Sequence, residues 1–203
     1  MKIICVGRNY VDHIEELKND KPDEPILFIK PDTSIIQKKQ PFFFPHFTND
    51  IHYEVELLVR INKIGKHIQT KFAPKYYDEI GLGIDFTARS LQNELKSKSL
   101  PWEKAKSFDG STLIGHWFSK KEFKNINNIN FSLERNGSKV QIGNTNKMLW
   151  KIDELISYVS TFFTLKIGDV LFTGTPSGVG NIYKNDNLRG YLERKIAFSI
   201  NIK

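Results

Sequence analysis

The sequence predicts an α+β fold in which β-strands predominate. Nine segments have the alternating or short apolar pattern of strands, whereas only two have the apolar spacing of helices. The 203 residues are 39% hydrophobic, with 15 Phe among them, which is enough to bury a sizeable core. No internal repeat or linker divides the chain, so we expect a single domain over residues 1–203.

The strands are predicted where runs of β-branched and apolar residues end at glycine, proline or polar clusters. The run His52–Val59 is the clearest, because its apolar and polar residues alternate as on a half-buried strand. In chain order, the predicted strands are residues 2–6, 26–29, 42–44, 54–61, 80–85, 113–118, 130–135, 169–173 and 196–202.

Two helices are predicted. Thr87 is a residue type that caps helix N-termini, and Leu91 and Leu95 would give a helix through about Lys98 its buried side. A second helix is expected to begin at Asp153. Its apolar stripe consists of Leu155, Ile156, Val159, Phe162 and Phe163.

Three consecutive phenylalanines lie within Pro41–Pro45. On a strand, at least one ring would point to each face. The run therefore indicates either a strand buried on both faces or a strand that is partly buried in a subunit interface.

Composition argues against several classes of protein. The net charge is +7, but no run is dense in both basic and aromatic residues, so we predict no nucleic-acid partner. No apolar run approaches the roughly 20 residues that span a bilayer, which argues against a membrane protein. The short run Met1–Val6 indicates a first strand instead of a signal peptide. The single cysteine, Cys5, fits a reducing compartment, so we expect a cytoplasmic protein.

Carboxylates are concentrated in the best predicted strand. Glu54 and Glu56 would lie side by side on one face of it, and Asp85 follows about thirty residues later. Three buried carboxylates are tolerable only if some are protonated or if a divalent cation lies among them. The alternative is a solvated strand face, because spacing alone does not place Asp85 beside the glutamates.

His13 and Glu16 are a candidate hydrogen-bonded pair. They are close enough to hydrogen-bond if they share a helical turn, and residues 12–24 would then close over a bound ligand.

The glycine-rich segment Thr173–Gly180 lacks the motifs of nucleotide-binding loops. It would either offer backbone N–H groups and the Thr175 hydroxyl to a carboxylate or form a tight turn.

Six segments, taken in order, resemble the fumarylacetoacetate hydrolase family, and in particular its short acylpyruvase and oxaloacetate decarboxylase branch. The segments are Cys5–His13, Leu27–Pro31, the Glu-x-Glu strand, Asp85–Arg89 with Gln92, Pro101–Asp109 and Gly168–Gly180. The resemblance spans nearly the whole chain. It implies a mixed β-sandwich roll and a homodimer.

The resemblance also implies roles for individual residues. A Mg²⁺ ion, or Mn²⁺ or Ca²⁺ in the same site, would be held by Glu54, Glu56 and Asp85. The catalytic residues would be His13, Glu16, Lys106 and Gln92. The substrate-binding residues would be Arg89, Thr175 and Lys30.

The implied activity is cleavage of a C–C bond in small 2,4-dioxo acids, such as fumarylpyruvate or acetylpyruvate, or decarboxylation of oxaloacetate through a metal-bound pyruvate enolate. Two alternatives remain: an isomerase, decarboxylase or hydratase of aromatic catabolism, and a non-catalytic metal-binding protein. The sequence chooses neither the reaction nor the metal. It departs from the family at Gly115-His116, where proline usually follows the glycine; we interpret His116 as a loop residue outside the pocket.

Overall fold

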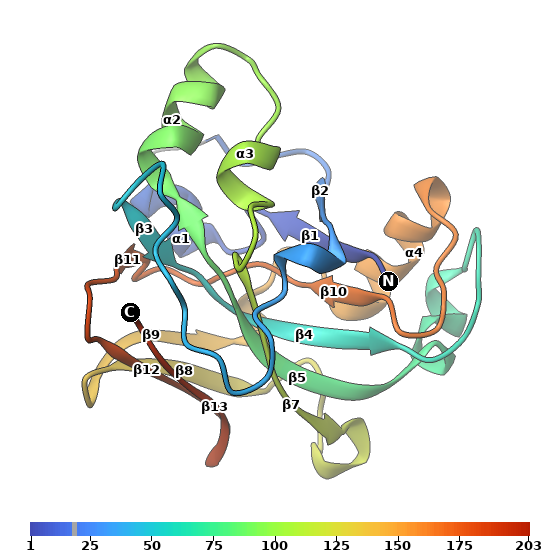
Figure 1. The fold of residues 1–203 in the computed structure, drawn as a ribbon. Coiled ribbons are helices and arrows are strands. Elements are labelled where there is room, and N and C mark those ends of the chain that lie inside the picture. The colour runs from blue at the N-terminus through green and yellow to red at the C-terminus, as the bar shows by residue number, and fades with distance from the viewer. Residues whose placement is uncertain (18–19) are drawn as a thin grey trace.

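The computed structural model describes residues 1–17 and 20–203, and three sheets and four α-helices lie within them (Figure 1). The largest sheet has six strands in the order β2-β1-β10-β4-β5-β7. Strands β1 and β10 are parallel and the other neighbours are antiparallel. The six strands are β1 (Ile3–Gly7), β2 (Ile26–Lys30), β4 (Val55–Ile61), β5 (Tyr77–Asp85), β7 (Thr112–Ser119) and β10 (Val170–Phe172).

Two smaller sheets flank the large one (Figure 1). The three-stranded sheet comprises β11 (Gly180–Asn181), β3 (Ile51–Tyr53) and β6 (Thr87–Ala88). The four-stranded sheet comprises β13 (Lys195–Asn201), β12 (Asn187–Leu192), β8 (Asn130–Arg135) and β9 (Ser138–Asn144). The helices are α1 (Val11–Glu16), α2 (Arg89–Ser97), α3 (Glu103–Lys106) and α4 (Ile152–Phe162). The predicted class, mainly β with mixed sheets, is confirmed. None of the described helices is long and apolar enough to cross a membrane.

Strand β4 shows how sequence alternation builds the core. Val55, Leu57 and Val59 are fully buried in the main apolar core, together with residues of β5, β8, β12 and α4. On the opposite face, Leu58 packs in a second, smaller apolar cluster, and Glu56 lies on that same face. Each buried aliphatic side chain contributes about 1.5–3 kcal/mol, so this alternation fixes which face carries the carboxylate.

The phenylalanine run is not a buried strand. Phe42 is buried and makes a single bridge to Ile202, whereas Phe43 is 63% exposed and Phe44 is half-buried. The prediction of a strand over residues 42–44 is therefore wrong, and so is burial on both faces. The interface interpretation remains a prediction.

Helix boundaries differ from expectation for a physical reason. α2 begins at Arg89, two residues later than predicted, because Thr87 pairs in β6 and its hydroxyl accepts a hydrogen bond from Lys106 (2.6 Å) instead of capping the helix. Leu95 is buried as predicted. α4 begins at Ile152 and buries three residues of the predicted stripe, but Phe162 is 57% exposed.

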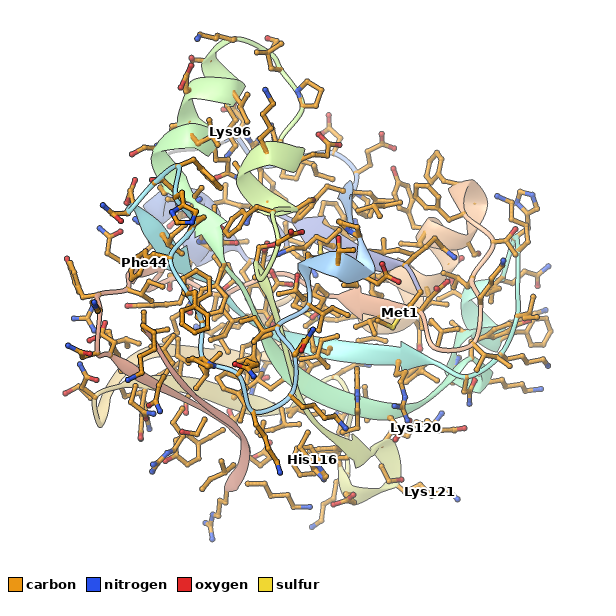
Figure 2. The ribbon with its side chains drawn as sticks, viewed as in Figure 1. Met1, Phe44, Lys96, His116, Lys120 and Lys121 are labelled. Carbon is orange, nitrogen blue, oxygen red and sulfur yellow. The ribbon has the colours of Figure 1, made fainter. Side chains whose placement is uncertain are left out.

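His116 lies within strand β7, not in a loop, and its ring packs edge-on against Phe118 (4.9 Å between centroids). Figure 2 shows it at the end of the molecule away from α2, where Lys96 is labelled. The departure from the family sequence therefore does not alter the cavity described below. Residues 18 and 19, part of the segment expected to close over a ligand, lie outside the described residues.

Candidate active site

A bend shared by two paired strands brings the three carboxylates together. The pairing of β4 with β5 and the pairing of β3 with β6 keep one register across the bend, with Val55 opposite Ile84 and His52 opposite Thr87. Glu54, at the bend, therefore lies opposite Asp85, whose N–H donates to the Glu54 carbonyl (2.9 Å). Carboxylate oxygens of Glu54, Glu56 and Asp85 lie within 4.8 Å of one another, and all three residues are buried.

The three carboxylates are held in unequal electrostatic environments. Burial raises the pKa of Glu56 well above its usual range, and the charges of Asp85 and Glu54 raise it further. Burial also acts to raise the pKa of Glu54, but the cations Lys106 and Arg89 outweigh it and hold that pKa well below its usual range. Within the described part of the chain, no basic side chain forms an ion pair with Glu56. Three buried carboxylates, one of them without a cationic partner, provide the oxygen donors that a hard divalent cation prefers.

Three basic side chains surround the other two carboxylates. Lys30 Nζ donates to Asp85 (2.6 Å) and to the Ser111 carbonyl, and Arg89 forms an ion pair with Glu54. Lys106 Nζ donates to Glu54 (2.8 Å) and to Asp85 (2.7 Å). Burial acts to lower the pKa of Lys106, but these two carboxylates outweigh it and raise the pKa, so the ammonium is charged at neutral pH.

Glu56 is held by the backbone of the glycine-rich segment. Gly174 N–H donates to Glu56 Oε2 (2.7 Å) from a left-handed conformation, with φ of +99°. A Cβ on Gly174 would lie 2.8 Å from Asn9 Cβ, and Asn9 is itself fixed by its amide donating to the Thr173 carbonyl (2.8 Å). Only glycine combines this conformation with this close approach.

We expect Gly174→Ala to destabilise the fold and to loosen Glu56. Gly168→Ala is the matched control, since Gly168 also has a positive φ (+87°) but has nothing within 4 Å of its Cβ position. Backbone strain alone should cost about 1–2 kcal/mol in the control. Gly174→Ala should cost more, because its Cβ also meets Asn9; chemical denaturation of both variants measures the difference. Equal losses would contradict the close packing of Gly174 on Asn9.

The predicted His-Glu pair forms on α1. His13 Nδ1 lies 3.2 Å from Glu16 Oε2, and Glu16 Oε1 accepts a hydrogen bond from Gly178 N–H (2.9 Å). Burial lowers the pKa of His13 below its usual range, although Glu54 and Glu16 oppose the shift. His13 is therefore neutral at pH 7, with Nε2 left free for proton transfer.

These groups line one cavity, which opens to solvent. Eight of the ten predicted site residues line it, and Glu16 contacts the lining residue His13. The eight are His13, Glu54, Glu56, Asp85, Arg89, Gln92, Lys106 and Thr175. Lys30 is fully buried behind Asp85 and does not line the cavity. Two of the backbone N–H groups expected to bind a ligand are occupied, since Gly174 and Gly178 donate to Glu56 and Glu16.

Sequence reasoning missed four charged or aromatic residues of the lining: Arg8, Phe28, Lys96 and Trp102. Arg8 and Phe28 lie inside the segments that carry the family resemblance, and Trp102 follows Pro101 in a third. The sequence contained one indication that Lys96 belongs to the site: it lies four residues after Gln92 and therefore on the same face of α2.

Comparison with known proteins identifies the family. A family model described as fumarylacetoacetate (FAA) hydrolase C-terminal matches residues 2–199. Oxaloacetate tautomerase YcgM of Escherichia coli (strain K12) is 42% identical over 188 residues, which cover 92% of this chain and 86% of that protein. The mitochondrial oxaloacetate decarboxylase of Dictyostelium discoideum is 42% identical over 182 residues, which cover 89% of this chain and 84% of that protein.

A solved structure, fumarylpyruvate hydrolase from Pseudomonas aeruginosa in complex with Mn²⁺ and pyruvate, matches with a TM-score of 0.93 at 31% identity, covering 100% of this chain and 89% of that one. The chain therefore belongs to the fumarylacetoacetate hydrolase family, as its motifs predict. It is an enzyme of that family.

Proposed function

We propose that the enzyme acts on small 2-oxo acids and stabilises their enol or enolate forms beside the carboxylate cluster. One observation carries this proposal: three buried carboxylates converge on a cavity that the Lys106 ammonium and the His13 imidazole also line. The names of the related proteins support it, since oxaloacetate, fumarylpyruvate and pyruvate are all 2-oxo acids.

We further propose that Glu54, Glu56 and Asp85 hold a divalent cation, Mg²⁺ in the first instance, with Mn²⁺ or Ca²⁺ able to use the same oxygens. The environment of Glu56 supports this assignment, because a buried carboxylate with no cationic partner is costly to ionise unless a cation binds it. Such a cation supplies Lewis-acid polarisation of a bound 2-oxo group.

Lys106 is the proposed donor to the enolate oxygen. An ammonium has three protons, and those of Lys106 are engaged by Glu54, Asp85 and Thr87. When the two carboxylates serve as ligands, their bonds to Lys106 weaken, and the ammonium regains donors that face the cavity. It can then stabilise negative charge that develops on substrate oxygen.

His13 is the proposed base. Its neutral imidazole keeps Nδ1 against Glu16, so Nε2 takes the proton from the substrate carbon or from an attacking water. Glu16 sets the ring orientation and ties α1 to the glycine-rich segment through Gly178.

The remaining residues position these groups or bind substrate. Gln92 accepts from Arg89 (2.7 Å), so the pair acts as a unit beside Glu54, with the Gln92 amide toward substrate. Thr175 is held by Gln141 Nε2 (3.0 Å), and its hydroxyl is the proposed contact for the substrate carboxylate. Lys30 is now assigned to hold Asp85 instead of binding substrate, because it is fully buried away from the cavity.

Oxaloacetate is the first substrate to test. Removal of a proton or of CO₂ next to the 2-oxo group gives an enolate in either case, so tautomerisation and decarboxylation need the same charge stabilisation. Acylpyruvate hydrolysis is the second candidate, favoured by the placement of the His13–Glu16 pair at the cavity, where it can activate water.

We also propose a single domain, a homodimer with the exposed Phe43 in its interface, and a cytoplasmic location.

The deciding experiment is a substrate panel assayed with Mg²⁺ and after EDTA treatment. Oxaloacetate tautomerisation, oxaloacetate decarboxylation and hydrolysis of acetylpyruvate and fumarylpyruvate should be compared on one preparation. We expect turnover of oxaloacetate that EDTA abolishes and Mg²⁺ or Mn²⁺ restores. Full activity in the EDTA-stripped protein would overturn the metal assignment, and no turnover of any 2-oxo acid would overturn the function.

A further inference from the structure

Two basic side chains in the outer part of the cavity have no role in the chemistry described above. Arg8 follows β1, and both side chains are half-buried and line the cavity. Lys96 lies on α2, as Figure 2 shows. Gln92 lies one helical turn before Lys96, so the two side chains share the cavity face of α2.

An aromatic wall connects these outer cations to the carboxylate cluster. Lys106 Nζ lies 5.5 Å from the centroid of the Phe28 ring, and the Phe28 and Trp102 centroids are 6.3 Å apart. Lys96 Nζ in turn lies 5.0 Å from the centroid of Trp102. Since Lys106 is buried and Lys96 is half-buried, the wall runs from the inner ammonium outward to the second one.

The two outer cations lack anionic partners. Within residues 1–17 and 20–203, neither Arg8 nor Lys96 forms an ion pair. Arg8 Nη1 donates to the Asp20 carbonyl (3.3 Å), and the buried Nε of Arg8 has no hydrogen-bond partner. Arg8 also adopts a left-handed conformation, with φ of 58°, which is unfavourable for a residue with a Cβ. A guanidinium that lines a cavity and has no carboxylate partner can pair with an anionic ligand there.

The inner charges are already balanced. The carboxylates of Glu54, Glu56 and Asp85 are matched in number by Lys30, Lys106 and Arg89, so a bound divalent cation would leave an excess of positive charge. Arg8 and Lys96 add to that excess. Burial lowers the pKa of Lys96 to about 8, and Arg8, Arg89 and Lys106 contribute to the shift.

We infer that Arg8 and Lys96 form a second anion-binding subsite, which receives the distal carboxylate of a dicarboxylic 2-oxo acid and makes the enzyme selective for dianions over monoanions. The inference rests on the proposed function and narrows its substrate class. The 2-oxo group and its adjacent carboxylate would bind at the inner cluster, with the aromatic wall along the carbon chain. The far carboxylate would then pair with the guanidinium and the ammonium.

The test compares the tautomerisation of oxaloacetate with that of its 4-methyl ester, in which the distal carboxylate carries no charge. Tautomerisation is the reaction to measure, because the ester has no free distal carboxylate to lose as CO₂. In the Mg²⁺-loaded wild type, kcat/KM should favour oxaloacetate by roughly 10- to 100-fold, the range expected for one charged hydrogen bond. Lys96→Met keeps the apolar stem on Trp102 and should remove most of this preference while leaving the ester unaffected. Arg8→Met should act in the same direction, and Lys96→Arg should restore the preference.

Lys98→Met is the matched control, because Lys98 is the C-cap residue of α2 and is exposed and paired with Glu94 (2.6 Å). It should leave the preference unchanged. Equal kcat/KM for the two compounds in the wild type, or a proportional loss for both in Lys96→Met, would overturn the subsite. If neither compound is turned over, the proposed function fails, and the Kd values of the two compounds from calorimetry decide the subsite by the same ratio.

The preference should also depend on pH. The groups that face Lys96 are Arg8, Arg89, Lys106 and Glu54, and among them the pKa of Lys96 is lowered to about 8. Lys96 loses its charge as pH rises through that value, so the ratio of kcat/KM for the dianion over the ester should fall above pH 8. This fall should be absent in Lys96→Met; its persistence there would assign it to another group.

Discussion

Replacement of His13 by alanine should lower acylpyruvate hydrolysis by roughly 10²–10⁴-fold, the usual worth of a general base. Decarboxylation of oxaloacetate should suffer less, because loss of CO₂ requires no attacking water. His13 makes no contact with the carboxylate oxygens of the cluster among the described hydrogen bonds, so Mg²⁺ affinity should change little. Both reactions, and Mg²⁺ binding, should be measured on the same preparation.

Glu16→Gln is the companion variant, since it keeps the hydrogen-bonding shape but removes the charge that orients His13. It should reduce hydrolysis less than His13→Ala. Burial lowers the pKa of His13, so the imidazole becomes protonated only below pH 6.5. The kcat/KM for hydrolysis should therefore decrease as pH drops below that value. Equal losses in both reactions would show that His13 orients or encloses substrate, and intact hydrolysis would remove it from the mechanism.

The carboxylate cluster should respond to substitution in two opposite ways. Asp85 accepts from both Lys30 and Lys106 and is fully buried. Among the described ion pairs, Asp85→Asn therefore removes the one carboxylate paired with Lys30 and one of the two paired with Lys106. Breaking a buried ion pair by removing one partner costs about 3–5 kcal/mol, and we expect Asp85→Asn to lose stability of that order in EDTA.

Glu56→Gln removes the carboxylate that is destabilised by burial and by its neighbours, and should stabilise the metal-free protein at neutral pH.

The sign of the Glu56 effect can be checked with pH. Its folded-state pKa is raised, so in the wild type the penalty for ionising Glu56 is absent at low pH and appears as pH rises toward and through that pKa. The advantage of Glu56→Gln in chemical denaturation should therefore grow from acidic to neutral pH. Both variants should lose the increase in Tm that Mg²⁺ gives the wild type. A Glu56→Gln variant that is less stable than wild type in EDTA at every pH would contradict the proposed imbalance of charge.

The sequence by itself determined which residues of the Glu-x-Glu strand share a face. Alternation is a local property of extended backbone, so the order of residues alone places Glu56 and Leu57 on opposite faces of the strand. The helical pairing of His13 with Glu16, three residues apart, is local in the same sense and is found as predicted. Strands β9 and β12 were missed because their pairing partners, not their own alternation, stabilise them.

Tertiary structure decided which groups these side chains contact. Asp85 meets Glu54 only because β4 and β5 pair in one register and bend together into the three-stranded sheet, and no spacing rule specifies a register between residues thirty positions apart. The same holds for Lys30, which packing buries behind Asp85, and for Arg8 and Lys96, which meet at one cavity from β1 and α2. Local periodicity sets the direction of a side chain, but the charge that it faces is set by non-local strand pairing and packing.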